Sequence, residues 1–437
     1  MNLLHTVPRR RSAAALASRL YRTYRVAGTA ARMYAIYKLP EAVRFGRGPR
    51  SAQAIATTNE RASQVLLDLA FDLRGVTIKM CQGIATRSDR FPPSFIEKLK
   101  QCHDAVPSQS FEVIAAQVER ELGRPLSELF SSFEPTPLAS ASLAQVHAAT
   151  LHDGSEVAVK VQYPDIADIV RTDLANMRRA CRVYERFDPQ PMELMPLIDE
   201  LATHIGYELD FEREARSAER VRALFANNPR VLVPSIHHEY SSKRVLTMQK
   251  LQGIKITDKQ HMLEAGLKPR EVLQDLMHIF VHMIMADGFF QADPHPGNLM
   301  VTPDGRIIVL DFGLSKELPE GFGLGLFELM FSMMTMNESA MIRAFSELGF
   351  ATKTGDGRTF VAIAERMMRR SKNGRFEGEF TEEMTDELFE AIRADPVVSV
   401  PSDFVLVGRV FSLLSGIAHT LGHRANVLRA MGASAPG

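Results

Sequence analysis

The stretch from Gly288 to Gly313 constrains this chain more than any other part of its sequence. It contains Asp293, then Asn298 five residues later, and then Asp311 thirteen residues after that. A strand–turn–strand pattern over Leu299–Leu310, with Pro-Asp-Gly at its turn, predicts a short hairpin between the second and third of these polar residues. We therefore expect a fold that brings two carboxylates and one carboxamide from distant positions to a single site.

Phosphoryl transfer is the chemistry that this set of side chains fits. One carboxylate must orient the attacking hydroxyl or water, while a second carboxylate and a carboxamide hold Mg²⁺ on a nucleoside triphosphate. Mg²⁺ prefers oxygen ligands and keeps several of its waters, so one or two protein carboxylates suffice to hold it. The order Asp–x4–Asn followed by Asp311-Phe312-Gly313 is also typical of the second half of the protein-kinase signature.

An upstream lysine could supply the positive charge that such a site needs. The sequence predicts strands at Val146–Leu151 and Val157–Gln162, and Lys160 lies on the second. An ammonium group on an otherwise apolar strand requires a partner, and nucleotide phosphates together with a helix carboxylate would provide one. The small residues at 139–142 precede these strands, and such a loop can let backbone N–H groups approach phosphates. An Ala/Ser run of this kind is also typical of a helix.

Composition argues against several classes of protein. Across 437 residues, Lys and Arg equal Asp and Glu in number (52 each), and a formal net charge of zero argues against nucleic acid as the main partner. The three cysteines, Cys81, Cys102 and Cys181, form no CxxC pair and indicate reduced thiols. No run of eighteen uncharged apolar residues occurs, so we expect no transmembrane helix; Phe404–Gly422 comes nearest, but Arg409 interrupts it.

The first 50 residues are strongly basic. They contain eleven Lys or Arg residues and one acid, Glu41. This composition at helical spacing fits a basic amphipathic segment on an anionic membrane surface, an organelle transit peptide, or a solvated basic tail. The sequence leaves these alternatives open, so we expect a cytoplasmic protein or one at the periphery of a membrane, which in a eukaryote would be mitochondrial or plastid.

Helical and strand patterns surround these motifs. Apolar periodicity predicts three helices before the first strand, a helical region split near Phe187-Asp188-Pro189, and a helical chain from Gly313 to its end. Two further strands are expected to complete the small sheet that carries Lys160. The expected elements are helices at Thr57–Arg87, Phe95–Cys102, Phe111–Leu122 and Val272–Ala286, helical residues 165–225, and strands at Val231–His237 and Lys243–Met248.

Together, six short motifs resemble those of the AarF/ABC1/UbiB atypical kinases, a family that includes proteins tied to coenzyme Q biosynthesis. The resemblance runs from about Thr57 to about Gly422. Two motif residues depart clearly from the family pattern, since Cys81 stands in place of a Gly and Gln291 in place of a His that many members have; Ser140 in place of an Ala is a mild change. The motifs are KMCQ at 79–82, PLASASLAQVH at 137–147, VAVK at 157–160, ELDFEREA at 208–215, QADPHPGN at 291–298 and DFG at 311–313.

The resemblance implies roles for the residues that would meet the nucleotide. Asp293 would be the catalytic-loop Asp, and Asn298 and Asp311 would hold Mg²⁺. Lys160 would contact the phosphates of ATP or ADP, serve the catalytic site alongside Asp293, and pair with Glu214.

Two further motifs gain roles from the same resemblance. Ala139, Ser140, Ala141 and Ser142 would form the family's Ala-rich loop, which replaces the usual Gly-rich loop over the nucleotide. Lys79 and Gln82 would belong to the family's KxGQ motif, which covers the place where a protein substrate would otherwise dock. Lys79 would meet Glu208 and Asp210. Together with Gln82, these residues would also border the nucleotide.

The resemblance also implies an α+β chain with a protein-kinase-like bilobal fold, in which a small β-rich N-lobe and a helical C-lobe follow an N-terminal helical extension. The expected boundaries are 1–56 for the basic segment, 57–125 for the extension with its KxGQ-like motif, 126–250 for the N-lobe with a helical insert, and 251–437 for the C-lobe. The segment after DFG is short and lacks Ala-Pro-Glu, which disfavours a protein substrate.

Our first hypothesis is an ATP- and Mg²⁺-dependent kinase or ATPase acting in ubiquinone or other isoprenoid-lipid metabolism. Its partners would be a small-molecule or isoprenoid lipid substrate, a membrane surface and enzymes of coenzyme Q biosynthesis, and not nucleic acid. A nucleotide-gated scaffold that binds lipid or partner enzymes without turnover would use the same residues. A small-molecule kinase of the aminoglycoside or choline type shares the acidic residues but gives no reason for the helical extension.

Overall fold

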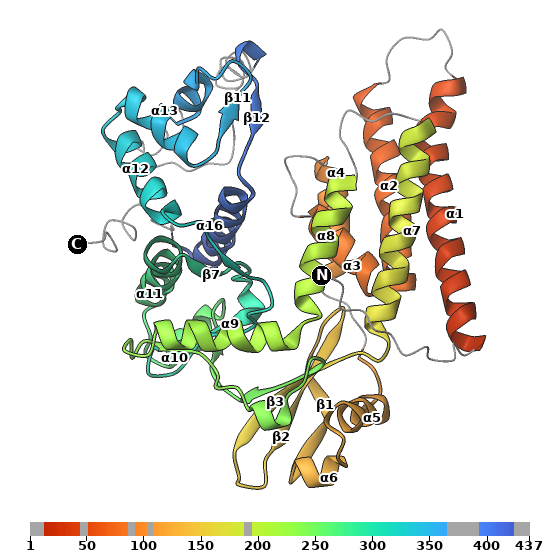
Figure 1. Cartoon of the computed structure of the whole chain (residues 1–437), viewed down its shortest axis with the longest axis vertical. Coiled ribbons are helices and arrows are strands. Elements are labelled where there is room, and N and C mark those ends of the chain that lie inside the picture. Colours follow the sequence, from red (N-terminus) through yellow and green to blue (C-terminus); the bar gives the residue numbers. More distant parts are fainter. Residues whose placement is uncertain are drawn as a thin grey trace. The chain divides into compact units, whose positions relative to one another are not determined.

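The computed structural model describes residues 13–43, 51–85, 92–103, 108–187, 195–364 and 393–423. The chain divides into two compact units (Figure 1): unit 1 comprises Met1–Arg213 and Ile236–Lys250, and unit 2 comprises Glu214–Ser235 and Leu251–Gly437. Each unit contains both helices and strands, which confirms the α+β class. The predicted break at Asp188-Pro189 and the predicted helix end at Arg87 lie outside the described residues.

Three long helices form one part of unit 1. Helix α1 (Ala13–Val43) packs against both α2 (Ala52–Leu73) and α7 (Ile166–Phe187), and the three lie side by side in Figure 1. The described part of the basic N-terminal segment is therefore a packed helix, and the prediction of a solvated tail is wrong for residues 13–43.

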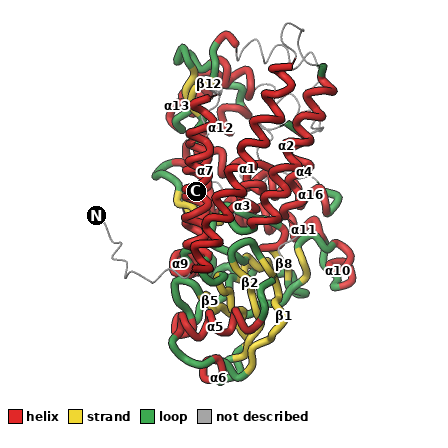
Figure 2. The backbone as a smooth tube through the Cα atoms, turned by 90° about the vertical axis from the view of Figure 1, so that its right-hand side faces the viewer, coloured by secondary structure: helices red, strands yellow, loops and turns green. Residues whose placement is uncertain are grey.

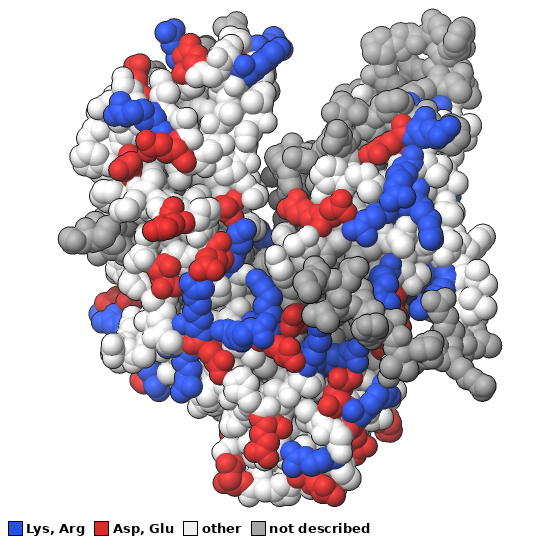
Figure 3. Space-filling model, in the orientation of Figure 1, with Lys and Arg blue, Asp and Glu red and all other residues white. Residues whose placement is uncertain are grey.

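Ion pairs between these helices use the arginines of the basic segment. Arg22 of α1 binds Asp173 of α7 through two hydrogen bonds, with 2.6 Å between Nε and Oδ1 and a second from Nη2 to Oδ2. Both side chains are buried, whereas the pair of Arg25 with Asp72 of α2, at 3.1 Å, is partly exposed. On the face drawn in Figure 3, Lys and Arg side chains are interleaved with Asp and Glu.

The helix predicted over Thr57–Arg87 is broken in two. Helix α2 ends at Leu73, and α3 (Val76–Ala85) begins after two residues with left-handed backbone, Arg74 (φ 54°) and Gly75 (φ 55°). The N–H of Arg74 donates to the carbonyl of Ala70 and closes α2. Gly adopts this conformation without the steric cost of a Cβ, which allows the chain to turn here. Helix α4 (Pro93–Leu99) then continues into the 3₁₀ turn η1 (Lys100–His103).

A four-stranded antiparallel sheet forms the other part of unit 1. Its order is β1-β2-β3-β5, and the chain runs through helices α5 and α6 just before β1. Figure 2 shows these strands grouped with α5 and α6, apart from the long helices. The helix predicted at Phe111–Leu122 is confirmed as α5. The bounds are β1 Ser132–Ser140, β2 Ala144–Thr150, β3 Glu156–Gln162, β5 Val245–Gln249 and α6 Leu126–Leu129.

A buried polar network fastens strands β1 and β2. His147 on β2 is fully buried, and its Nδ1 lies 2.8 Å from the carbonyl oxygen of Glu134 on β1. Its Nε2 lies 2.7 Å from Nε2 of Gln145, so the amide donates to the ring and the ring donates to Glu134. Gln145 in turn accepts a hydrogen bond from the backbone N–H of Gln109. These contacts fit a neutral imidazole.

Two predictions about the chain between β3 and unit 2 need correction. The helical residues 165–225 form three helices, because α8 (Met195–Glu208) and α9 (Phe211–Leu224) are separate. The strand predicted at Val231–His237 is reduced to β4 (Val231–Leu232), which pairs in parallel with β9 of unit 2, and to an antiparallel bridge from Ile236 to Met248 of β5 in the sheet that carries Lys160. Pairing partners depend on tertiary contacts, which local patterns do not report.

Unit 2 contains the stretch from Gly288 to Gly313. Helix α11 (Pro269–His282) ends in a π-helical turn at Met283–Asp287, and β7 (Phe289–Gln291) follows. One sheet has the order β4-β9-β8-β6, and β7 pairs with β10. The remaining bounds are β6 Ile254–Lys255, α10 Lys259–Glu264, η4 Pro296–Asn298, β8 Leu299–Val301, β9 Ile307–Val309, β10 Ser315–Glu317, α12 Phe322–Met334 and α13 Glu338–Glu347.

The chain after Gly313 is not helical throughout, contrary to the prediction. Strands β11 (Ala351–Thr352) and β12 (Val397–Ser399) pair in an antiparallel ladder before the last described helix, α16 (Ser402–Thr420). Short strands of two or three residues carry too little alternation to be recognised in the sequence.

Removing one side of the buried Arg22–Asp173 pair should destabilise unit 1. Burial raises the pKa of Asp173 and Arg22 opposes this, so Arg22→Ala leaves a desolvated carboxyl group without its partner. We expect a loss of about 3–5 kcal/mol in unfolding free energy, measured by urea denaturation followed by circular dichroism. As a control, Arg178→Ala removes the exposed pair with Asp199 between α7 and α8 and should cost about 1 kcal/mol or less. Similar losses in the two variants would contradict this account.

His147 should make the stability of the fold depend on pH. Burial lowers the pKa of His147, whereas imidazole in the unfolded chain titrates near its ordinary value of about 6.5. The unfolded chain therefore binds the proton first, so stability is full above this value and falls as the pH drops below it. Melting temperatures at neutral pH and at roughly one unit below 6.5 should differ more for the wild type than for His147→Gln. Equal differences in the two proteins would show that His147 carries no such effect.

Candidate functional site

The predicted hairpin between Asn298 and Asp311 is confirmed. Strand β8 pairs with β9 so that Leu299 lies opposite Val309 and Val301 opposite Ile307, and Gly305 makes the turn with φ 88°. Asn298 directly precedes β8 and Asp311 follows β9, and the N–H of Leu310 donates to the carbonyl of Asn298. The hairpin therefore returns the chain to its starting point and places Asn298 and Asp311 at the same end.

The side chain of Gln291 joins the catalytic-loop segment to the DFG segment. Its Nε2 donates to the carbonyl oxygen of Asp293 at 2.7 Å and to that of Asp311 at 3.1 Å. Gln291 is 1% exposed, and β7, on which it lies, pairs with β10 beyond the DFG. One buried carboxamide thus bridges the two segments whose aspartates the sequence singled out.

Asp311 adopts a backbone conformation that few non-glycine residues adopt. Its φ is 57°, in the left-handed region, and such strain persists only where surrounding contacts hold it. Here the carbonyl oxygen accepts from Gln291, and Oδ1 accepts from the N–H of Gly313 at 3.1 Å. Non-glycine strain concentrates at functional sites, which marks this Asp for a role beyond packing.

Glu214 and Asp311 converge beside Gly313. A Cβ added at Gly313 would lie 3.3 Å from Oδ1 of Asp311 and 3.6 Å from Oε2 of Glu214, and Glu214 is only 2% exposed. A carboxylate buried this deeply requires a compensating positive charge or several hydrogen bonds. Gly313 leaves room between the two carboxylates, since a side chain there would approach both of them.

The side-chain amide of Asn298 binds the catalytic-loop segment through its nitrogen. Its Nδ2 donates to the carbonyl of Asp293 at 3.3 Å, which leaves Oδ1 as the free acceptor of the amide. Asn298 and Asp311 together offer the amide and carboxylate oxygens that Mg²⁺ on a triphosphate needs. The part of the chain that the structure describes contains no cluster of three or more His, Cys, Asp or Glu residues suited to a metal. Such a cluster is not required where phosphates and waters supply the other ligands.

The structure adds one residue that the sequence analysis did not assign to the site. Arg409 Nη2 on α16 donates to Oδ1 of Asp293 at 2.9 Å. In the sequence, Arg409 counted only as an interruption of an apolar run. A charged residue in the middle of an apolar helix needs a partner, and this requirement was the signal that could have identified it.

The length and apolar composition of helix α16 also bear on membrane insertion. Among the described residues it is the one helix that is long and apolar enough to cross a membrane, and 28% of its most apolar 18 residues are buried. Besides Arg409, it offers Asp403, whose Oδ1 lies 3.0 Å from Nζ of Lys316 on β10. This is an ion pair by distance, although it lacks hydrogen-bonding geometry. Two charged contacts thus attach α16 to the rest of unit 2.

In unit 1, the Ala-rich segment forms a tight hairpin between β1 and β2. Ala139 and Ser140 lie on β1, and the N–H of Ala141 donates to the carbonyl of Ala144 at 2.8 Å. That N–H is used within the turn, so it differs from the open phosphate nest suggested by the sequence. The hydroxyl of Ser142 is buried and has no partner among the described residues. Tyr163 Oη donates to the carbonyl of Ala141 at 3.0 Å, and burial raises the pKa of this tyrosine to about 12.

Lys160 lies in the same row of the sheet as the Ala-rich segment. Val146 pairs with both Ala139 and Lys160, which places Ala139 and Lys160 two strands apart, about 10 Å between backbones. On β3 the side chains of Val157, Val159 and Val161 are fully buried, and Lys160 points to the opposite face. Its Nζ lies 5.2 Å from the ring centroid of Phe211, the first residue of α9.

The KMCQ segment makes specific contacts within unit 1. Lys79 Nζ on α3 lies 2.8 Å from Oε1 of Glu208 on α8, so the expected contact between these two residues is present. Gln82 Nε2 donates to the carbonyl of Cys102 on η1 at 3.0 Å. Asp210 accepts the backbone N–H of Arg213 through Oδ1, at the start of α9.

Two of the cysteines, which are distant in sequence, meet in space. Cys81 and Cys102 are both buried in one apolar cluster and are free thiols. A hydrogen bond with Cys102, together with burial, holds the pKa of Cys81 well above its usual range. Cys81 therefore fills core space beside Cys102, which explains how α3 accommodates it.

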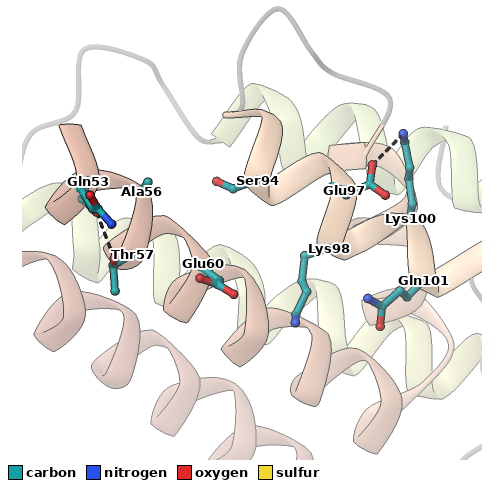
Figure 4. A pocket seen from close by; sticks show the side chains of 9 residues that line it. All are labelled: Gln53, Ala56, Thr57, Glu60, Ser94, Glu97, Lys98, Lys100 and Gln101. Atoms are coloured by element: carbon teal, nitrogen blue, oxygen red, sulfur yellow. Dashed lines mark hydrogen bonds and ion pairs between the residues drawn. The ribbon is translucent and has the colours of Figure 1, made fainter.

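A cavity of about 680 Å³ lies between α2, α4 and η1 (Figure 4). Its lining is mixed in charge, with Glu60, Glu97, Lys98 and Lys100, and Lys100 is paired with Glu97 at 3.1 Å. None of the predicted site residues lines it, and the charges balance, so the cavity gives no reason to place the chemistry there.

The predicted site residues divide between the two units. Unit 2 brings together Glu214, Asp293, Asn298 and Asp311 around Gln291 and Gly313. Unit 1 holds Lys160 and the Ala-rich segment on one sheet, and Lys79 with Glu208 between two helices. The carboxylates and the carboxamide that the sequence separates are therefore neighbours in unit 2.

Several known proteins are similar in sequence to this chain over most of its length. Residues 101–345 match the family described as the ABC1 atypical kinase-like domain. AarF domain-containing protein kinase 1 of Xenopus laevis is 32% identical over 83% of this chain and 71% of its own length. The chloroplastic protein ACTIVITY OF BC1 COMPLEX KINASE 3 of Arabidopsis thaliana is 33% identical over 78% of this chain and 48% of its own length. The chain thus spans less than two thirds of some of its curated relatives.

A solved structure supports the same fold. The structure of Rv3197 from Mycobacterium tuberculosis, determined in complex with erythromycin, aligns with 88% of this chain and 99% of that chain. The TM-score is 0.58 at 24% sequence identity, which shows a shared fold. With the family match and these relatives, the chain belongs to the ABC1 (AarF) family of atypical kinase-like proteins.

Proposed function

We propose that this protein is an ATP- and Mg²⁺-dependent atypical kinase or ATPase whose reacting groups belong to unit 2. The observation that carries the proposal is the bridge made by Gln291, which fixes Asp293 and Asp311 to each other through their backbone carbonyls. Phosphoryl transfer depends on positioning and electrostatic stabilisation, so a rigid link between the residue that orients the acceptor and the residue that holds the metal is the feature it requires.

Each polar residue in unit 2 has a separate task in this proposal. Asp293 accepts the hydrogen bond of the attacking hydroxyl or water and orients it. Asp311 and Oδ1 of Asn298 hold Mg²⁺, which when bound offsets the negative charge of the triphosphate. The strained backbone of Asp311 supports this role, because it sets the direction of the carboxylate before any ligand arrives.

The residues of unit 1 are proposed to bind the nucleotide. Lys160 binds phosphate oxygens, which offset the cost of an ammonium group on an otherwise apolar strand. The Nζ of Lys160 lies beside the ring of Phe211, the first residue of α9. The Ala-rich hairpin lies in the same sheet row as Lys160 and covers the phosphates with small side chains.

We propose a small molecule or an isoprenoid lipid as the phosphoryl acceptor, with ubiquinone-type metabolism as the setting. Two observations support a non-protein acceptor. The segment after DFG is short, and the pair of Lys79 with Glu208 fixes the KMCQ helix α3 to α8. We place the protein in the cytoplasm or an organelle interior, at the surface of a membrane where such lipids reside; two plant relatives are named as chloroplastic proteins.

A nucleotide-gated scaffold is the second candidate function, and one contact favours it. Arg409 occupies Oδ1 of Asp293, and an ion-paired carboxylate is a weaker hydrogen-bond acceptor for a substrate hydroxyl. A phosphate-release assay, run with and without lipid vesicles containing an isoprenoid phenol, separates the two. Release above the no-enzyme rate supports the enzyme, while nucleotide binding without release supports the scaffold.

Asp293→Asn should lower turnover and leave nucleotide binding intact. The amide keeps the size of the side chain but loses the charge that orients the acceptor, so we expect kcat for ATP hydrolysis to fall about 10²–10⁴-fold. Asp304→Asn, in the exposed turn of the β8–β9 hairpin, is the matched control and should keep wild-type turnover. Unchanged phosphate release by Asp293→Asn would exclude the proposed role.

Asp311→Asn should instead weaken the binding of Mg·ATP. Losing the carboxylate removes one of the two protein ligands of Mg²⁺, so affinity should fall about tenfold or more in the presence of Mg²⁺. Binding measured in EDTA should change much less, because the metal is then absent. A variant that loses affinity equally with and without Mg²⁺ would show that Asp311 supports the fold and not the metal.

A further inference from the structure

Arg409 stands out among the groups that the proposed function does not use. It lies in the middle of α16 between two buried valines, Val407 and Val410, where a charge is unfavourable without a partner. Its Nη2 donates to Oδ1 of Asp293, and its Nε is buried without a partner among the described residues. Within the described ranges, the guanidinium therefore binds one acceptor, the carboxylate that the proposed function makes essential.

Asp293 is held at its backbone and at one side-chain oxygen. Its carbonyl accepts from Gln291 and from Asn298, which fixes the main chain. Arg409 fixes Oδ1, and among the described residues this is the one oxygen of the carboxylate that a side chain binds. A carboxylate fixed in this way can rotate little about its last bond, so Oδ2 keeps a constant direction.

We propose that Arg409 is a positioning residue of the phosphoryl-transfer site, which holds Oδ1 of Asp293 so that Oδ2 accepts the hydrogen bond of the attacking group. The inference rests on the proposed function and deepens it. The positive charge of Arg409 also offsets the repulsion between the Asp293 carboxylate and the phosphates that approach it.

The pair is too exposed to serve mainly as a stability element. The side chains of Arg409 and Asp293 are 32% and 34% exposed, and ion pairs at that exposure contribute little to folding. Helix α16 keeps its separate contact between Asp403 and Lys316 when Arg409 is replaced. Arg409→Ala and Arg409→Gln should therefore fold, which circular dichroism and melting temperature verify.

The first test compares turnover with nucleotide affinity in full-length variants. For Arg409→Ala we expect kcat for ATP hydrolysis to fall about 10–100-fold, because a displaced reacting group typically loses rate on this scale, while KM for Mg·ATP changes less than about twofold. Arg409→Lys, which keeps the charge but not the forked geometry, should recover part of the rate. A large rise in KM together with a fall in kcat would point to a general structural defect and overturn the proposal.

Two control variants distinguish positioning of the Asp293 carboxylate from attachment of helix α16. Asp403→Asn weakens the other charged contact of α16, and Arg230→Ala removes the exposed pair with Asp275 elsewhere in unit 2. Both should keep kcat near the wild-type value. If Asp403→Asn lowered kcat as much as Arg409→Ala does, attachment of α16 would explain the effect, and the positioning role would be wrong.

A double-mutant cycle then asks whether Arg409 acts through Asp293. In the Asp293→Asn background, Arg409→Ala should produce little further loss of rate, because the carboxylate that it positions is already gone. Independent, multiplying losses would contradict the inference. An increase of turnover in Arg409→Ala would also contradict it, because the guanidinium would then be blocking the carboxylate.

The outcomes distinguish this inference from the proposed function. If Asp293→Asn leaves turnover unchanged, the proposed function fails, whatever Arg409 does. If Asp293→Asn abolishes turnover and Arg409→Ala does not lower it, the proposed function stands and Arg409 has no positioning role.

Discussion

The buried carboxamide of Gln291 is the interaction on which the site in unit 2 depends. Its two hydrogen bonds join the backbones of Asp293 and Asp311, whereas the hairpin alone brings only Asn298 and Asp311 to one end. They also support the left-handed backbone of Asp311, a conformation that costs free energy when nothing holds it. The Asp293 carbonyl that Gln291 binds also accepts from the side-chain amide of Asn298, so the three residues share one hydrogen-bonded arrangement.

Much of this arrangement could be predicted from the sequence, because the features that encode it are local. Alternating apolar residues and a Pro-Asp-Gly turn define the β8–β9 hairpin within twelve residues. Helix α5 has its predicted bounds because its signal, apolar residues at helical spacing, is also local. The order of Asp293, Asn298 and Asp311 around that hairpin is itself the chemical signature. Once the hairpin forms, Asn298 and Asp311 must lie at one end of it.

The features that could not be predicted depend on contacts between distant residues. The break between α2 and α3 requires left-handed backbone at Arg74, which a residue of this type seldom adopts. Strand β4 pairs in unit 2 because its partner β9 lies there, and no local pattern names a partner. The contact of Arg409 with Asp293 spans 116 residues, so the sequence could show only that a charge in an apolar helix lacked an explanation.

Calorimetric titration of a non-hydrolysable ATP analogue into Gln291→Leu, with and without Mg²⁺, measures what the Gln291 bridge contributes to the site. Leucine keeps roughly the volume of the side chain but removes both hydrogen bonds, so Asp311 should lose its fixed orientation. We expect the affinity in the presence of Mg²⁺ to fall about tenfold or more relative to the wild type, while the affinity in EDTA stays close to the wild-type value. Wild-type affinity in the presence of Mg²⁺ would show that the Gln291 bridge is not what prepares the site.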